Sequence, residues 1–351
     1  MSGIANNGTP TYTSYYNQYL ADLQFYHASP SFRWGNLVAG PLQGNAVVWS
    51  VLPNPWSRVP TSAGDGAFTE FAGVGAGTNT ATPQAQDTLV WSSPGSAAQQ
   101  SFTNGAAFWT PTPSTIPVSD SKSSRDPAGI AIGPNWNVRR PSYTNTNGQL
   151  MYVVAGVGKQ VYGLFANGDA SDAHWEDLGH VGSGENVSAI SSFDGSVVFV
   201  GTDQGNICEL TQPYPQGQQC VNFTIDKPQS GTTAPVSGLF EIFPTIAIAT
   251  TGSSPGYVLT FTGQSWQMAG GGLPSNLPFV SVDGPGLNSV FAANRNQVFV
   301  SHDLGTSWLL ASDGLPAVTN VQELHYVLQP DNKQYMYFGS SGCSMLRTPL
   351  Q

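Results

Sequence analysis

The stretch Ser301-His302-Asp303-Leu304-Gly305-Thr306-Ser307-Trp308 follows an alternating apolar segment, QVFVS (297–301), and leads into a second one, LLAS (309–312). Ser and Asp side chains accept hydrogen bonds from backbone N–H groups in tight turns, and Gly permits the turn itself. A tryptophan placed directly after the turn can cover the neighbouring strands. The stretch therefore predicts a β-hairpin whose polar turn delivers a buried tryptophan.

A unit of four short strands, the last beginning near an aromatic residue, recurs from about residue 126 to the C-terminus. The second strands read MYVVAG (151–156), VVFVGT (197–202), IAIATT (246–251), VFAANR (290–295) and YMYFGS (335–340). The fourth strands begin near Trp175, Phe223, Trp266 and Trp308. A repeat of about 42–48 residues is typical of four-stranded propeller blades. The sequence therefore predicts an all-β fold, a β-propeller of four-stranded antiparallel blades.

The two ends of the chain predict how the ring closes. The last repeat stops at Gln351 without a fourth strand, and SFRWGNLVAGP (31–41) carries a matching tryptophan. We expect residues 31–41 to close the final blade, with residues 1–30 as an N-terminal extension, because closure leaves no open sheet edge. This arrangement gives one domain over residues 1–351 with six blades. The long segment from Gly44 to Pro113 could hide a seventh.

The amino-acid composition disfavours some classes of binding partner. Only 9% of the residues are charged, against roughly 25% in an average globular protein. The net charge is −10 with only 11 Lys and Arg, which disfavours nucleic acid because phosphate binding needs clustered cations. No segment is long and apolar enough to predict a membrane span: the most apolar run, residues 236–250, is interrupted by Glu241 and Pro244.

The cysteines indicate the cellular compartment in which the protein is located. Cys208 and Cys220 flank the turn-like stretch TQPYPQGQQ, so we expect them on neighbouring strands and joined by a disulfide, with Cys343 left over. A disulfide favours an extracellular, secreted protein. The start MSGIANNGTP lacks the features of a signal peptide, which keeps a cytoplasmic location as the alternative.

The stretch at 301–308 resembles the Asp-box, S-x-D-x-G-x-x-W, of the sialidase (BNR-repeat) β-propeller superfamily. FTGQSW (261–266) and NGAAFW (104–109) are weaker copies that keep a Gly and the Trp. The resemblance implies that Ser301, Asp303, Gly305 and Trp308 stabilise the fold on the face opposite the ligand. Catalytic sialidases also carry an arginine triad, and the nearest match to their first motif, residues 32–34 (FRW), lacks its Ile-Pro. Sialidase activity itself is therefore not expected.

The scarce charged residues gather on one set of loops. In a four-stranded blade, the loop from the outer strand to the next inner strand lies on the same face as the turn between strands two and three. We expect the candidate ligand-binding residues on this face: Arg125, Asp126, Glu185 and Glu323 on the first kind of loop, and Lys159, Asp203 and Arg295 on the second. No spacing typical of a metal or cofactor site is present, so neither is expected.

Three functions fit this pattern. The first is a carbohydrate-binding, lectin-like protein that holds a glycan through polar and aromatic loops. The second is a polysaccharide-active enzyme, either a glycoside hydrolase or a lyase, for which Glu185, Asp203 and Glu323 are the available carboxylates. The third is a structural or assembly propeller. The sequence identifies no catalytic residue and does not choose among the three.

Overall fold

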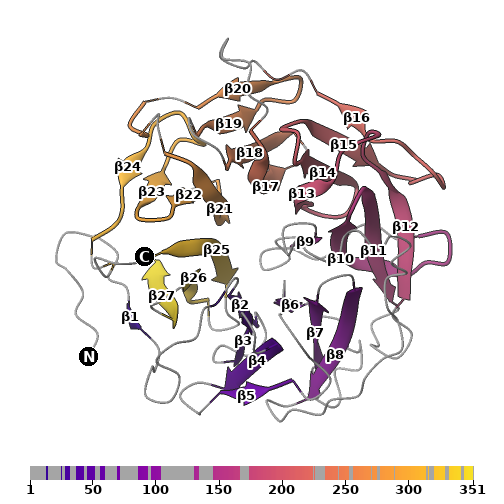
Figure 1. Cartoon of the computed structure of the whole chain (residues 1–351), viewed down its shortest axis with the longest axis horizontal. Coiled ribbons are helices and arrows are strands. Elements are labelled where there is room, and N and C mark those ends of the chain that lie inside the picture. The colour runs from indigo at the N-terminus through magenta and orange to yellow at the C-terminus, as the bar shows by residue number, and fades with distance from the viewer. Residues whose placement is uncertain are drawn as a thin grey trace.

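The computed structural model describes residues 13–14, 25, 28–31, 37–42, 46–51, 56–59, 69–71, 86–93, 96–103, 130–133, 145–166, 174–223, 225, 234–243, 245–252, 256–269, 271–274, 277–287, 289–313, 315, 320–328, 332–340 and 344–350. These residues form small antiparallel sheets arranged in a ring (Figure 1). The predicted all-β propeller of four-stranded antiparallel blades is confirmed.

Six of the sheets in the described part of the chain have four strands. From the inner strand outward they are β2 (Ser29–Pro30), β3 (Leu37–Leu42), β4 (Ala46–Val51) and β5 (Ser57–Arg58); β9 (Ile130–Gly133), β10 (Leu150–Val157), β11 (Gln160–Ala166) and β12 (His174–His180); β13 (Val187–Ser191), β14 (Val197–Thr202), β15 (Ile207–Thr211) and β16 (Val221–Asn222); β17 (Val236–Phe243), β18 (Ile246–Thr251), β19 (Val258–Phe261) and β20 (Trp266–Met268); β21 (Phe279–Gly286), β22 (Ser289–Asn294), β23 (Val298–Ser301) and β24 (Leu309–Leu310); and β25 (Val321–Leu328), β26 (Gln334–Ser340), β27 (Ser344–Leu350) and β1 (Thr13–Ser14).

A three-stranded sheet of β6 (Thr69–Phe71), β7 (Gln86–Ser93) and β8 (Ser96–Thr103) completes the ring. The inner strands β2, β6, β9, β13, β17, β21 and β25 contact one another in this order, and β25 contacts β2. The ring of the described residues therefore holds six four-stranded sheets and one three-stranded sheet. The three-stranded sheet lies within residues 44–113, where the sequence left room for a further unit.

The ring closes through an N-terminal strand, as predicted, but through a different one. Thr13 and Ser14 pair with Arg347 and Leu346 of β27, so β1 is the outer strand of the last blade. Residues 31–41 were expected in that role, but residues 37–41 instead belong to β3 and pair with β4. All six residues of β3 are buried, which suits a second strand, whereas the outer strands β5, β16 and β24 are exposed. Residues 1–30 are therefore not a mere extension, because β1 and β2 belong to sheets.

Small residues near the ends of the second strands let consecutive blades pack closely. A Cβ added at Gly156 of β10 would lie 2.3 Å from Val187, the first residue of the next inner strand. A Cβ added at Gly201 of β14 would lie 2.5 Å from Val236, the first residue of β17. The small residues that the repeat shows at these positions are thus needed for contact between blades.

The predicted structural role of the Asp-box agrees with its geometry. Asp303 accepts hydrogen bonds from the Ser301 hydroxyl (2.8 Å) and from the backbone N–H (2.8 Å) and hydroxyl (2.6 Å) of Ser307. Trp308 is buried, and its indole N–H donates to the carbonyl of Gly305 at 3.0 Å. In the weaker copy, Trp266 is equally buried, but its indole N–H finds no acceptor among the residues that the structure describes.

Candidate functional site

The upper face is defined here by the turns between second and third strands and the loops that lead from each outer strand to the next inner strand. These two kinds of loop are hydrogen-bonded together. Val187 N–H donates to the Gly158 carbonyl (2.7 Å), and Val321 N–H donates to the Arg295 carbonyl (2.9 Å). The upper-face loops of neighbouring blades are therefore held against one another, as the sequence interpretation required.

Asp203 anchors one of these contacts. Its two carboxylate oxygens accept hydrogen bonds from the backbone N–H (3.0 Å) and the side-chain amide (2.8 Å) of Asn186. The Asp203 N–H in turn donates to the Asn186 carbonyl at 3.0 Å. The turn between β14 and β15 is thus fixed to the loop between β12 and β13.

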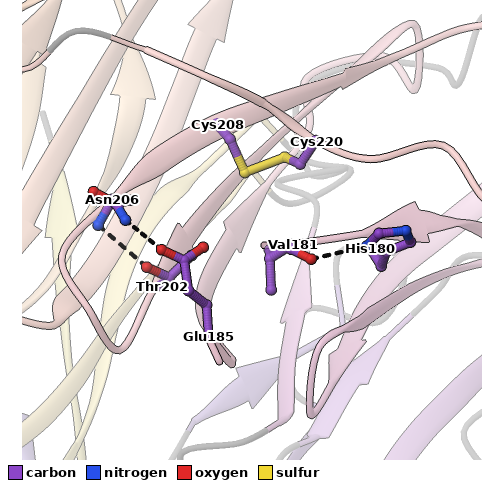
Figure 2. Close-up of a disulfide and its surroundings, with 7 residues drawn as sticks. All are labelled: His180, Val181, Glu185, Thr202, Asn206, Cys208 and Cys220. Atoms are coloured by element: carbon purple, nitrogen blue, oxygen red, sulfur yellow. Dashed lines mark hydrogen bonds between the residues drawn. A yellow bond between two sulfur atoms is a disulfide. The ribbon is translucent and has the colours of Figure 1, made fainter. Parts of the chain in front are cut away.

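Glu185 forms a second contact between the same two loops. Its Oε1 accepts a hydrogen bond from the Asn206 amide, and the Asn206 N–H donates to the Thr202 hydroxyl at 3.2 Å (Figure 2). The other oxygen, Oε2, is buried and has no partner within the described residues. Two acids and two amides therefore hold this part of the upper face in one conformation.

The structure brings together part of the predicted set. Lys159, Glu185 and Asp203 lie in adjoining loops of the β9–β12 and β13–β16 blades, where Lys159 is exposed. Arg295 is also exposed on the upper face but belongs to the β22–β23 turn, in a different blade. The placement of Glu323 was wrong: it lies within strand β25, opposite Gly339, and is half-buried. Arg125 and Asp126 lie outside the described residues.

The sequence reasoning missed the uncharged members of the site. Asn186, Gln204 and Asn206 carry no charge, so the pattern of charged residues does not include them. The stretch Asp203-Gln204-Gly205-Asn206 between two apolar strands was an available signal, since Asn, Asp and Gly favour tight turns. Gly205 has a φ of +74°, and a Cβ there would lie 2.3 Å from the Ala234 carbonyl, so the turn also touches the next blade.

A disulfide supports this region from the outer side of the blade. Cys208 of β15 and Cys220 are joined, with a Cα–Cα distance of 5.5 Å, which is the pair favoured from sequence (Figure 2). The Cys220 N–H donates to the His180 carbonyl and the His180 N–H donates to the Gln218 carbonyl, both at 2.9 Å. The disulfide thus ties β15 to a segment that pairs with the preceding blade.

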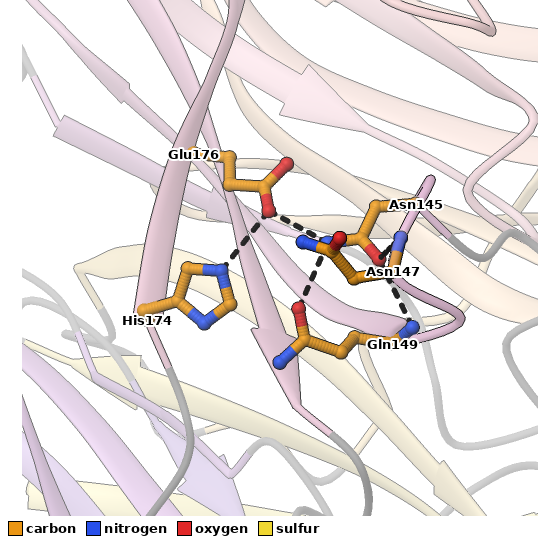
Figure 3. A network of polar contacts seen from close by, with 5 residues as sticks. All are labelled: Asn145, Asn147, Gln149, His174 and Glu176. Carbon is orange, nitrogen blue, oxygen red and sulfur yellow. Dashed lines mark hydrogen bonds and ion pairs between the residues drawn. The ribbon is translucent and has the colours of Figure 1, made fainter.

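A second polar cluster lies on the lower face, at the start of β10 and β12 (Figure 3). Glu176 accepts hydrogen bonds from the Asn145 amide (2.6 Å) and lies 3.0 Å from His174 Nε2. Asn145 also donates to Gln149 and accepts the Gln149 N–H, each at 3.0 Å. These contacts hold the turn before β10 against β12, and we assign the cluster a structural role.

Two further observations concern the described part of the chain alone. No group of three or more His, Cys, Asp or Glu side chains there is arranged to hold a metal ion. No helix in that part is long and apolar enough to cross a membrane.

Comparisons with known proteins identify the fold and leave the family open. No protein-family profile matches the sequence, and no curated protein matches it. Among solved structures, YCF48 bound to a D1 peptide is similar with a TM-score of 0.58 at 12% identity, covering 99% of this chain and 96% of that one. Sqt1 of Saccharomyces cerevisiae is similar with a TM-score of 0.60 at 11% identity, covering 98% of this chain and 99% of that one. The extracellular domain of BT4673 from B. thetaiotaomicron is similar with a TM-score of 0.59 at 12% identity, covering 97% of this chain and 40% of that one.

The fold and the Asp-box turn define the class. The chain is an all-β propeller that resembles the YCF48, Sqt1 and BT4673 propellers in architecture. At 12% identity or less, the likeness covers the fold alone, so function has to be argued from the upper face.

Proposed function

We propose that this protein is a non-catalytic binding propeller that takes its ligand on the upper-face loops of the β9–β12 and β13–β16 blades. The ligand class proposed first is a neutral carbohydrate chain. The observation that carries the proposal is the pair of carboxylate–amide contacts, Asp203 with Asn186 and Glu185 with Asn206, which fix the loops before any ligand arrives. A preorganised surface binds more tightly because less conformational freedom is lost.

The exposed groups of these loops suit sugar hydroxyls. The Asn186 amide, which also donates to Asp203, presents a second N–H and an oxygen. Lys159, Asn186 and Gln204 are exposed on these loops, and ammonium and amide groups hydrogen-bond sugar hydroxyls without demanding a charged partner. The carboxylates are less suited to hydrolysis. A glycosidase needs two acids free to act on either side of the bond, whereas Glu185 and Asp203 are each engaged by an asparagine.

A peptide is the second candidate. Amide side chains also pair with peptide backbones, and the similar YCF48 structure is described as bound to a D1 peptide. In this case the protein would act by holding a polypeptide segment, in keeping with the assembly role considered from sequence.

The two candidates are separated by screening the full-length protein against an array of neutral glycans and an array of peptides. Lys159→Ala and Gln204→Ala should each weaken binding of the ligand found by about tenfold, or about 1.4 kcal/mol, with an unchanged melting temperature. Lys333→Ala is the matched control, since Lys333 is exposed on the lower face. Binding of peptides alone would overturn the carbohydrate proposal. If binding is lost in Lys333→Ala and kept in the other two variants, the site lies on the lower face and the proposed position is overturned.

A further inference from the structure

A buried acid joins two inner strands next to the closing blade. Asp283 of β21 is only 8% exposed, and its Oδ2 accepts a hydrogen bond from the backbone N–H of Tyr326 in β25 at 2.7 Å. Its Oδ1 accepts the Gly284 N–H at 2.7 Å. β25 belongs to the blade that β1 closes, where the described residues Thr13 and Ser14 pair with β27. Asp283 is therefore part of the joint between that blade and the rest of the ring.

A second buried acid occupies a comparable place between the inner strands β13 and β17. Glu241 of β17 is 1% exposed, and its Oε2 accepts the Phe193 N–H at 2.9 Å. The Glu241 N–H donates to the Ser191 hydroxyl of β13 at 2.9 Å. Its Oε1 is buried without a partner among the described residues. Both acids thus bridge neighbouring inner strands inside the ring.

We propose that these two carboxyl-held joints, β13–β17 and β21–β25, make the propeller ring pH-sensitive, so that rising pH loosens the contact between neighbouring blades. A neutral carboxyl can stay buried in such a junction and still accept a backbone N–H. An ionised carboxyl loses its hydration there, and this loss disfavours the charged form.

The titratable surroundings support this direction. The strands packed against β21 carry Glu241 on β17 and Glu323, His325 and Tyr326 on β25, while β18 and β22 carry no titratable side chain. Burial raises the pKa of Asp283 to about 7. Burial also raises the pKa of Glu241 well above its usual range, and the nearby acids Asp194 and Glu209 add to this rise.

The sign follows from linkage. A carboxyl whose pKa is higher in the folded state binds its proton more tightly there, so its contribution to stability is full below the unfolded pKa and is lost as pH rises to the folded pKa. For Asp283 this window runs from about pH 4 to about pH 7. His325 acts in the opposite sense: burial lowers its pKa to about 4, so it costs stability as pH falls from about 6.5 to 4. The two effects overlap, and wild-type stability alone would hide them.

The test therefore compares wild type with Asp283→Asn. His325 is present in both proteins, so its contribution to the pH dependence of stability cancels in the comparison. The ratio of the unfolding constants, wild type over variant, should rise by on the order of a thousandfold between pH 4 and pH 7, at up to tenfold per pH unit. Asp313→Asn, at an exposed aspartate, is the control. Glu241→Gln should show a rise of the same sign.

Hydrogen exchange keeps the proposal testable if a variant fails to fold. In the wild-type protein, the protection factors of the Tyr326 and Phe193 amides, corrected for intrinsic rates, should fall from pH 5 to pH 8 relative to amides of β14. A ratio that is flat from pH 4 to pH 8, or protection at both amides that does not change with pH, would overturn the proposal.

Discussion

A methyl group placed on Gly201 would lie 2.5 Å from Cγ1 of Val236, in the next blade. Real Cβ atoms do not approach a neighbour so closely, so one strand would have to move away from the other. We expect Gly201→Ala to destabilise the protein by about 1–3 kcal/mol, the usual cost of overpacking. Gly156→Ala should behave alike, because its Cβ would lie 2.3 Å from Val187.

Gly271→Ala is the matched control for these substitutions. A Cβ at Gly271 meets nothing within 4 Å, and no left-handed backbone conformation is required there. Its unfolding midpoint in denaturant should lie close to that of wild type. Equal destabilisation at Gly201 and Gly271 would contradict the proposed importance of blade contact.

The Asp-box turn should respond to acid through Asp303. Hydrogen bonds from the side chain and backbone of Ser307 and from Ser301 lower the pKa of Asp303 to about 2. A lowered pKa gives stability that is present above the unfolded value near 4 and is lost as pH falls towards 2. Asp303→Asn should therefore melt below wild type at neutral pH, with a gap that narrows between pH 4 and pH 2.

That gap is measured by thermal unfolding monitored at the tryptophans. Ligand binding should be unaffected, because the turn between β23 and β24 lies on the face opposite the candidate site. A variant that keeps its melting temperature and loses its ligand would reverse the assignment of the two faces.

The disulfide should leave one titratable thiol. With Cys208 and Cys220 joined, denaturation without reductant should expose Cys343 alone, whereas full reduction should expose three thiols. Replacing both bridged cysteines with Ser should cost about 2–3 kcal/mol, since the bridge closes a loop with a sequence separation of only 12. Three reactive thiols in the unreduced protein would rule the bridge out.

Truncation should locate the closing strand. Removing residues 1–14 deletes β1 and exposes the edge of β27, so it should lower stability and promote association through the open edge. Removing residues 1–10 leaves β1 in place and is the control. Melting curves and light scattering of the two proteins should differ clearly. Identical behaviour would mean that β1 does not close the ring.

Most of the fold could be predicted because its signal is local. The second strand at 197–202 has the predicted limits, and Trp175, Trp266 and Trp308 lie at or beside the start of the outer strands as expected. The closing strand was misplaced because Thr13 and Ser14 pair with residues more than 300 positions away, and a two-residue strand carries no period of its own. Trp34 offered a stronger local pattern and drew the assignment to residues 31–41.

The candidate site was only partly predictable. Charge and topology predicted Lys159, Glu185 and Asp203 on one face, and their loops lie against one another in the structure. The partners of the two acids are Asn186 and Asn206, and nothing in an isolated sequence distinguishes an asparagine that holds a carboxylate from one that faces solvent. Glu323 was assigned to a loop because the start of a strand is less well marked than its centre.

The pairing of β1 with β27 also has a mechanical consequence. The first described strand and the last one lie side by side in one sheet, joined at Thr13–Arg347 and Ser14–Leu346. A force applied to the two ends of the chain would therefore load these two backbone pairs before it reached any other blade. The other blades would carry load only after β1 had detached from β27. Within the described residues, the pairing of Thr13 and Ser14 with β27 therefore determines the force at which the ring begins to open.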